Sequence, residues 1–272
     1  MPTLIPLLRA AINSAKRRQE LFLLLTVFAG LLTSLVYASA LESAFSLVAT
    51  AGAADNSGTD YTALSEQATE HLPSLIMGQL GLMVVAGFLL PLWARAASPA
   101  GLLPWDGSPA FFLRRGMLGF RHLITAALLT LASLVFIFVT ATALGFVGGS
   151  TSGFGIVLAL TVSIWVSIVF SAGANTAIIA AATDQQMTFR DALARNKTFL
   201  RPIAGSLAVI WFASILIDAA LEPALTGLIG ADTGFQYRAL AFLKGALGFI
   251  TAALHISVLY NIPGLFRTDT QA

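Results

Sequence analysis

The chain of 272 residues is 57% hydrophobic and only 10% charged, whereas about 25% of residues are charged in ordinary soluble domains. Its mean hydropathy is +0.84, and the stretch between His122 and Asp184 contains no Asp, Glu, Lys or Arg. These features argue against a large soluble core and favour a multi-pass helical membrane protein. The absence of cysteine excludes disulfides, thiolate metal ligands and a cysteine nucleophile.

An amphipathic basic segment leads into the first long apolar run. Apolar residues recur at helical spacing over 4–12, and the basic residues of the segment are Arg9, Lys16, Arg17 and Arg18. The apolar run 21–36 is followed by Ala38, Ser39 and Ala40, a pattern that also fits a cleavable signal peptide. We favour a retained span, because the twenty residues ahead of it are too long and too amphipathic for the basic start of a signal peptide.

The same pattern recurs at 108–147 and at 187–223. The second copy starts with a helix-initiating Ser108-Pro109 pair, and the third with a capping-box pattern followed by a proline bend at Pro202. Their basic residues are Arg114, Arg115 and Arg121 in the second copy, and Arg190, Arg195, Lys197 and Arg201 in the third. Three copies predict an internal repeat of one interfacial helix plus a pair of spans, over about 1–94, 108–182 and 187–260. The alternative is that basic residues precede spans only because membrane topology demands them.

Six apolar runs predict membrane spans: 21–41, 75–94, 123–146, 154–182, 203–225 and 239–260. The predicted fold is therefore an all-α polytopic membrane protein with six transmembrane helices in a single transmembrane domain, 1–272. Thirteen of the 15 Lys and Arg residues fall in segments on one side of the membrane, Arg238 falls on the other, and Lys244 lies inside the last span. The positive-inside rule then places both termini in the cytoplasm, for a protein of the bacterial inner membrane.

The outer loop 42–74 has acids but no Lys or Arg, and we expect a solvated linker with a short helix at 61–71, the alternative being a binding loop.

Charged residues inside spans are costly and usually have a partner or a function. Asp218 and Glu222 stand four residues apart in the fifth span, at the same depth as Lys244 in the sixth. We expect Lys244 to form an ion pair with one of the two acids and to pin the two helices together. The sharper alternative is part of a proton or ion path. Such a path should continue through the bilayer, and below these residues only His255 is found, near the inner end of the sixth span.

Uncharged polar and small residues of the spans indicate helix packing. Gln79 in the second span and Asn175 in the fourth are expected to form hydrogen bonds between helices. Gly173, Ala177 and Ala181 follow one another at four-residue spacing, which predicts a close helix approach.

Motifs for catalysis or cofactor binding are missing from the sequence. It has no P-loop, no HExxH, no GxSxG and no GxGxxG pattern. The three histidines lie in three different regions, so we expect neither a metal site nor a haem, and no cofactor. Because the basic residues cluster at span ends, nucleic acid is not an expected partner either. We therefore expect a non-enzymatic protein.

The segment 189–202, FRDALARNKTFLRP, resembles a segment of the YciC-like proteins and of the membrane domain fused to some bacterial glycerophosphodiester phosphodiesterases. In those families a short basic amphipathic helix alternates with pairs of spans. The resemblance covers most of the chain and implies a six-span inner-membrane protein. It carries over no catalytic residues, because the phosphodiesterase domain is absent from this sequence.

The leading functional hypothesis is a membrane protein that engages lipid, in particular anionic lipid, or a partner membrane protein or second copy of itself. Its headgroup-facing surface would be formed by Arg9, Lys16, Arg17, Arg18, Arg114, Arg115, Arg121, Arg190, Arg195, Lys197 and Arg201. The alternative is a small secondary transporter or ion-coupled permease that uses Asp218, Glu222 and Lys244. A membrane-embedded lipid enzyme ranks third.

Overall fold

The computed structural model describes residues 4–57, 61–99, 102–104, 107–148, 153–229 and 233–266. This part of the chain is helical almost throughout and contains no β-strand, which confirms the all-α class. Its nine helices are α1 (Leu4–Arg17), α2 (Gln19–Val36), α3 (Ala38–Ser57), α4 (Tyr61–Ala97), α5 (Pro109–Gly148), α6 (Gly153–Ala182), α7 (Phe189–Lys197), α8 (Leu200–Ile229) and α9 (Thr233–Tyr260).

Six stretches of these helices are long and apolar enough to cross a membrane. They match the six predicted runs in chain order: Gln19–Val36, Ser65–Ala97, Pro109–Ile137, Thr161–Ala182, Leu200–Leu221 and Gly234–Tyr260. The helices are thus those of a multi-pass membrane protein by length and composition.

Two of the three predicted amphipathic segments form helices of their own. Helix α1 ends before Arg18, whose backbone leaves the helical conformation (φ −124°, ψ 37°), and α2 starts directly afterwards. Helix α7 starts with the predicted capping box: the Asp191 N–H donates to Thr188 Oγ1 (3.2 Å), and the Thr188 N–H donates to Asp191 Oδ2 (3.1 Å). The break between α7 and α8 falls at 198–199, just ahead of the predicted bend. Pro202 then sits in the first turn of α8, where its missing N–H leaves no hydrogen bond unmade.

The second amphipathic segment is not a separate helix. It continues without a break into its span as the 40-residue α5, so the prediction of a separate interfacial helix in this copy is wrong. Its glycines do not interrupt the helix, because they are used for packing against α4. A Cβ built at Gly119 would lie 2.3 Å from the carbonyl oxygen of Gly87, so the two backbones touch at a point where only glycine fits.

The prediction that 42–74 forms a loop is also wrong, because most of these residues are helical. Helix α3 carries the chain as far as Ser57 and α4 begins at Tyr61, with 58–60 outside the described residues. The expected short helix at 61–71 is the first part of α4. The predicted span 21–41 is divided at Tyr37, where α2 ends and α3 begins. The Ala, Ser and Glu residues of α3 allow helix formation, and packing of α3 against α4 stabilises the helix, which the sequence pattern did not reveal.

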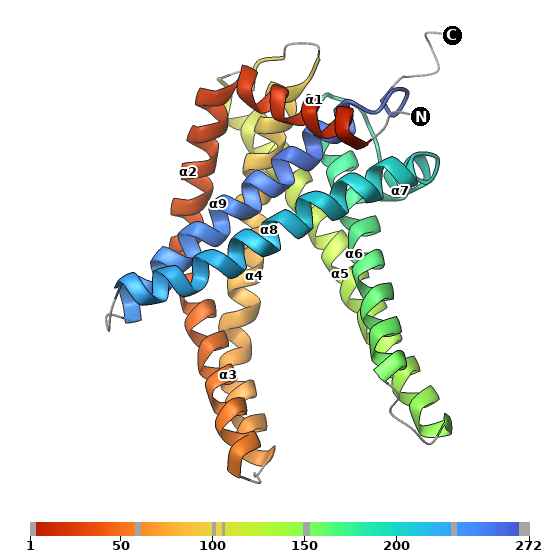
Figure 1. Cartoon of the computed structure of the whole chain (residues 1–272). Helices are drawn as coiled ribbons and strands as arrows, with labels where there is room; N and C mark the ends of the chain where they lie inside the picture. Colours follow the sequence, from red (N-terminus) through yellow and green to blue (C-terminus); the bar gives the residue numbers. More distant parts are fainter. Residues whose placement is uncertain are drawn as a thin grey trace.

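Most of the basic residues lie at one end of the molecule. Helices α1 and α7, the C-terminal ends of α4, α6 and α9, and the N-terminal end of α5 meet there (Figure 1). We call it the basic end. From it the α3–α4 and α5–α6 hairpins diverge, and the α8–α9 hairpin crosses the molecule at a slant (Figure 1).

The core lies near the basic end. Trp93, Ile178 and Ile256, each four residues before the end of its helix, are fully buried. Farther from this end, large apolar side chains such as Phe136, Trp165 and Phe212 are exposed. An apolar surface of this extent is typical of a face that lipid or protein covers.

Candidate functional site

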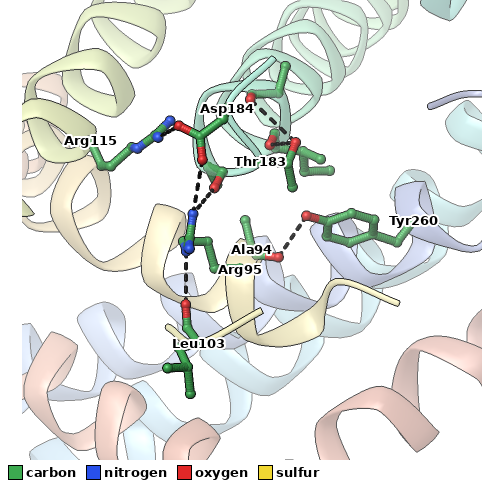
Figure 2. Close-up of polar contacts among 10 residues, drawn as sticks. Ala94, Arg95, Leu103, Arg115, Thr183, Asp184 and Tyr260 are labelled. Carbon is green, nitrogen blue, oxygen red and sulfur yellow. Dashed lines mark hydrogen bonds and ion pairs between the residues drawn. The ribbon is translucent and has the colours of Figure 1, made fainter. Parts of the chain in front are cut away.

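Three charged side chains from distant parts of the chain meet at the basic end. Arg95 comes from the last turn of α4, Arg115 from the second turn of α5, and Asp184 from the turn after α6 (Figure 2). Arg95 Nη1 lies 3.3 Å from Asp184 Oδ2, and Arg115 Nη2 bonds to Asp184 Oδ1. We call these three residues the arginine cluster. It ties α4 and α5 to the α6–α7 connection.

The guanidinium groups of the cluster are held from several directions. Arg95 Nε donates to the Leu103 carbonyl (2.8 Å) and Nη1 donates to the Ala182 carbonyl (3.0 Å). The ring of Phe111 lies beneath both arginines, 4.7 Å from Arg95 Cζ and 5.1 Å from Arg115 Cζ. Both arginine side chains are nearly buried, at 12% and 8% exposed, whereas the Asp184 side chain is 68% exposed. The cations are fixed and the anion faces outward.

Hydrogen bonds to α9 fix the end of α4 that carries Arg95. The Trp93 indole donates to the Ala253 carbonyl (2.9 Å), and the Tyr260 hydroxyl donates to the Ala94 carbonyl (2.7 Å; Figure 2). Buried bonds of this kind resist displacement because each unpaired group would be costly. The backbone on which Arg95 stands is therefore rigid.

The predicted basic surface is largely exposed, with one clear exception. Arg115 is buried within the arginine cluster and presents no charge to the outside. Arg195 is half-buried. The exposed members are Arg9, Lys16, Arg17, Arg18, Arg114, Arg121, Arg190, Lys197 and Arg201.

Helix α1 lies across the basic end at a steep angle to α2 (Figure 1). It buries Leu7 and Ala11 against the bundle and leaves Ile5 and Ile12 70% and 48% exposed. An open groove of about 450 Å³ runs along its outer face and is lined by Ile5, Leu8, Arg9, Ile12, Asn13 and Lys16. The outer face therefore combines apolar side chains with two cations.

Helix α7 presents a second exposed basic edge at the same end. Hydrogen bonds from the Thr188 hydroxyl and backbone hold the pKa of Asp191 below its usual value. The ionised carboxylate is thus the form that caps the helix.

The expected ion pair between the fifth and sixth spans is confirmed. Lys244 Nζ lies 2.8 Å from Asp218 Oδ2 and 3.1 Å from Oδ1, and joins α9 to α8. The side chain of Glu222, the other predicted partner, lies outside the described residues.

Further polar groups continue along the same helix pair. Thr251 Oγ1 donates to Ser214 Oγ (3.1 Å), and the His255 ring is hydrogen-bonded to the backbone of Leu207. His255 is only 2% exposed, and its Nε2 has no hydrogen-bond partner among the described residues. We call Asp218, Lys244, Ser214, Thr251 and His255 the α8–α9 seam. The seam extends from the charged pair toward the basic end.

The remaining polar span residues have structural surroundings. Gln79 Nε2 donates to the Tyr37 hydroxyl (3.3 Å), which confirms a contact between helices. Asn175 is buried in α6, and its expected hydrogen bond stays a prediction. The next residue, Thr176, donates to Asn196 Oδ1 (3.0 Å) and so fastens α7 to α6. In the described part of the chain, no three His, Asp or Glu side chains gather as metal ligands would.

Sequence reasoning did not assign Arg95 or Asp184 to any site. Two signals were available in the sequence. Arg95 directly follows the predicted span 75–94, and Asp184 is the first acid after the 61 residues 123–183, which contain no Asp, Glu, Lys or Arg. Spacing alone could not pair them, because the contacts join residues 89 and 69 positions apart.

Comparisons with known proteins do not extend this description. No protein-family model matches the chain, and neither curated proteins nor solved structures show a significant similarity to it.

Proposed function

We propose that this chain is a non-enzymatic multi-pass membrane protein that binds anionic lipid through the exposed basic helices of its basic end. A partner membrane protein that presents an acidic surface is the other occupant of the same face. The resemblance to the YciC-like proteins belongs to this proposal, as does a location in the bacterial inner membrane with the basic end in the cytoplasm.

The observation that carries the proposal is the outer face of α1. Ile5 and Ile12 are exposed beside Arg9 and Lys16, along an open groove. An amphipathic helix of this kind places apolar side chains at the level of the acyl chains and cations at the level of the phosphates. The inner face is already used for packing against the bundle, so the outer face is available for lipid.

Charge sidedness supports the proposed orientation. The exposed cations of α1, α5, α7 and α8 share the basic end, whereas Arg238 lies near the start of α9, at the other end. Lys and Arg near the ends of spans are retained on the cytoplasmic side. The cytoplasmic leaflet also carries the anionic lipids that such residues attract.

The test is thermal unfolding of the purified protein in neutral detergent, with added phosphatidylglycerol or phosphatidylcholine. A ligand that binds the folded state raises the midpoint of unfolding. We expect phosphatidylglycerol to raise it, salt to reduce the effect, and phosphatidylcholine to have little effect. In the variant with Arg9, Lys16, Arg17 and Arg18 changed to Gln, the apparent affinity should fall at least tenfold, at about 1 kcal/mol per basic residue near an anionic surface. Arg238→Gln, at the opposite end, is the control. An equal lipid response in the wild type and the α1 variant would refute the proposal.

A second candidate function is a small ion-coupled transporter, and the α8–α9 seam is the observation that favours it. A charged pair, a hydroxyl pair and a buried imidazole follow one another along one helix interface. Ionisable residues inside spans often mark ion or proton pathways. A purely structural ion pair does not require the further polar groups.

Proton flux into proteoliposomes that enclose a pH-sensitive dye separates the two candidates. A transporter should lose flux in the Lys244→Met and His255→Phe variants while the variants remain folded. No flux in the wild type, or flux that survives both substitutions, would remove the transporter from consideration.

A further inference from the structure

The arginine cluster has the form of an anion site with its own carboxylate already in place. Two nearly buried guanidinium groups face one carboxylate that is 68% exposed. Two backbone carbonyls hold Arg95, and the Phe111 ring lies beneath both arginines. Paired, preorganised guanidinium groups are the usual protein partners of phosphate, because each presents several N–H donors in one plane. The arrangement is rigid on the cation side and open on the anion side.

Asp184 fits this position imperfectly. Its backbone adopts the left-handed conformation (φ 62°). This conformation costs free energy for every residue except Gly, although the cost is smaller for Asn and Asp than for the others. Its Oδ2 lies 3.3 Å from Arg95 Nη1, longer than the usual 2.7–2.9 Å of a charge-assisted hydrogen bond. A carboxylate offers two oxygens to two cations from different helices. A bound phosphate is not tied to the backbone as Asp184 is, and so can approach both guanidiniums at normal distances: a monoester offers three non-bridging oxygens, and a phosphodiester headgroup offers two that are spaced more widely than those of a carboxylate.

The arginine cluster also lies near the ends of candidate membrane spans, a depth that suits a lipid phosphate. Arg95 lies two residues before the end of one candidate span, and Asp184 lies two residues after the end of another. Arg115 lies six residues into a third. The ends of spans are the level at which lipid phosphates lie.

We propose that Arg95 and Arg115 form a binding site for a phosphate group, which Asp184 occupies as an internal competitor until the phosphate displaces it. The phosphate comes from an anionic phospholipid headgroup or from a soluble phosphate ester. The first source rests on the proposed function and specifies a second lipid site, separate from the groove of α1. Displacement of Asp184 breaks the two ion pairs that join the α6–α7 connection to α4 and α5, while the Arg95–Ala182 hydrogen bond remains. Occupancy of the site is thereby coupled to the α6–α7 connection.

The central variant is Asp184→Asn. It removes the competing charge and keeps a residue that tolerates the left-handed backbone. The matched control is Glu70→Gln, which removes one negative charge from an exposed side chain of α4, 25 residues before Arg95. Arg95→Lys retains the charge of the site but loses the planar set of donors. Binding is measured for two probes, inorganic phosphate and short-chain phosphatidylglycerol in neutral detergent, and circular dichroism checks that each variant is folded.

We expect Asp184→Asn to bind at least one probe threefold or more tightly than the wild type, and Glu70→Gln to match the wild type. Adding Arg95→Lys to Asp184→Asn should abolish the gain. A gain for phosphatidylglycerol alone identifies a lipid headgroup as the source, and a gain for inorganic phosphate identifies a soluble anion. Unchanged or weaker binding of both probes by folded Asp184→Asn, or an equal gain in Glu70→Gln, would overturn the inference. If Asp184→Asn does not fold, wild-type binding that Arg95→Lys abolishes and Glu70→Gln retains supports the site, and its absence overturns it. Neither result depends on the α1 variant, so the inference and the proposed function fail separately.

Discussion

At the residue scale, the Lys244–Asp218 pair joins α9 to α8 within the apolar part of the chain. Its side chains are 25% and 41% exposed, so the protein buries the pair only in part. Removing one partner leaves a single charge in a poorly solvating environment, which is more costly than removing both.

We predict that Lys244→Met lowers the free energy of unfolding by about 1–3 kcal/mol, less than the cost for a fully buried pair because this one is partly exposed. Adding Asp218→Asn should recover part of the loss, since the unpaired charge disappears. Chemical or thermal unfolding of the wild type, both single variants and the double variant gives the coupling energy. Additive losses would mean that the ion pair contributes nothing to stability.

Adjacent arginines show what a sequence can reveal at this scale. Arg114 and Arg115 differ by one helical step, yet Arg114 is exposed and Arg115 is buried beside Asp184. The direction of each side chain depends on which face of α5 packs against α4, and the apolar residues around both arginines do not distinguish the faces. The Lys244–Asp218 pair was predictable, because few charged residues share one depth in the spans.

At the element scale, the N-cap of α7 was predictable because a capping box is a local pattern of four residues. The continuous α5 and the helical α3 were not. Their form depends on packing against α4, through the Gly87–Gly119 contact for α5 and a helical hairpin for α3. A glycine is therefore a weak indication of a helix break when a neighbouring helix fills the space that its side chain would occupy.

The α7 cap predicts both a substitution effect and a pH dependence. Thr188→Ala should destabilise the helix start by about 1 kcal/mol. Because the pKa of Asp191 is lowered in the folded state, its contribution is complete above the usual value of 3.8 and is lost as the pH falls through the lowered pKa. The hydrogen-exchange protection factors of the first turn of α7, which are corrected for the intrinsic pH dependence of exchange, should therefore be the same at pH 7 and pH 5. Asp191→Asn should weaken protection at neutral pH; unaltered protection in that variant would rule out the capping role.

The contact between α4 and α5 predicts a contrast between two glycines. Gly119→Ala places a Cβ against the Gly87 carbonyl and should cost at least about 2 kcal/mol, since backbone must move to admit it. Gly248→Ala in α9 meets no atom within 4 Å and should be neutral or slightly stabilising, because Ala favours helix more than Gly. Thermal unfolding of both variants checks the contrast, and similar midpoints would contradict the close helix crossing.

At the scale of the whole molecule, the separation of charge between the two ends predicts one orientation in the membrane. The chain has no cysteine, so single substitutions report the side on which a position lies. Ser65 and Thr198 are exposed, Ser65 in α4 on the side of the 58–60 connection and Thr198 at the basic end. An impermeant maleimide added to intact spheroplasts should label Ser65→Cys but should label Thr198→Cys only after lysis. The reverse pattern would invert the proposed topology.

The most direct test of lipid binding at the basic end is native mass spectrometry of the protein released from lipid nanodiscs. We expect phospholipid to be retained, with anionic species enriched over the nanodisc composition. Retention should fall when Arg190, Arg195, Lys197 and Arg201 are all changed to Gln, and fall further when the α1 residues are changed as well. A chain released without lipid would contradict lipid binding as the function, and a stoichiometric second polypeptide in its place would identify the basic end as a protein interface.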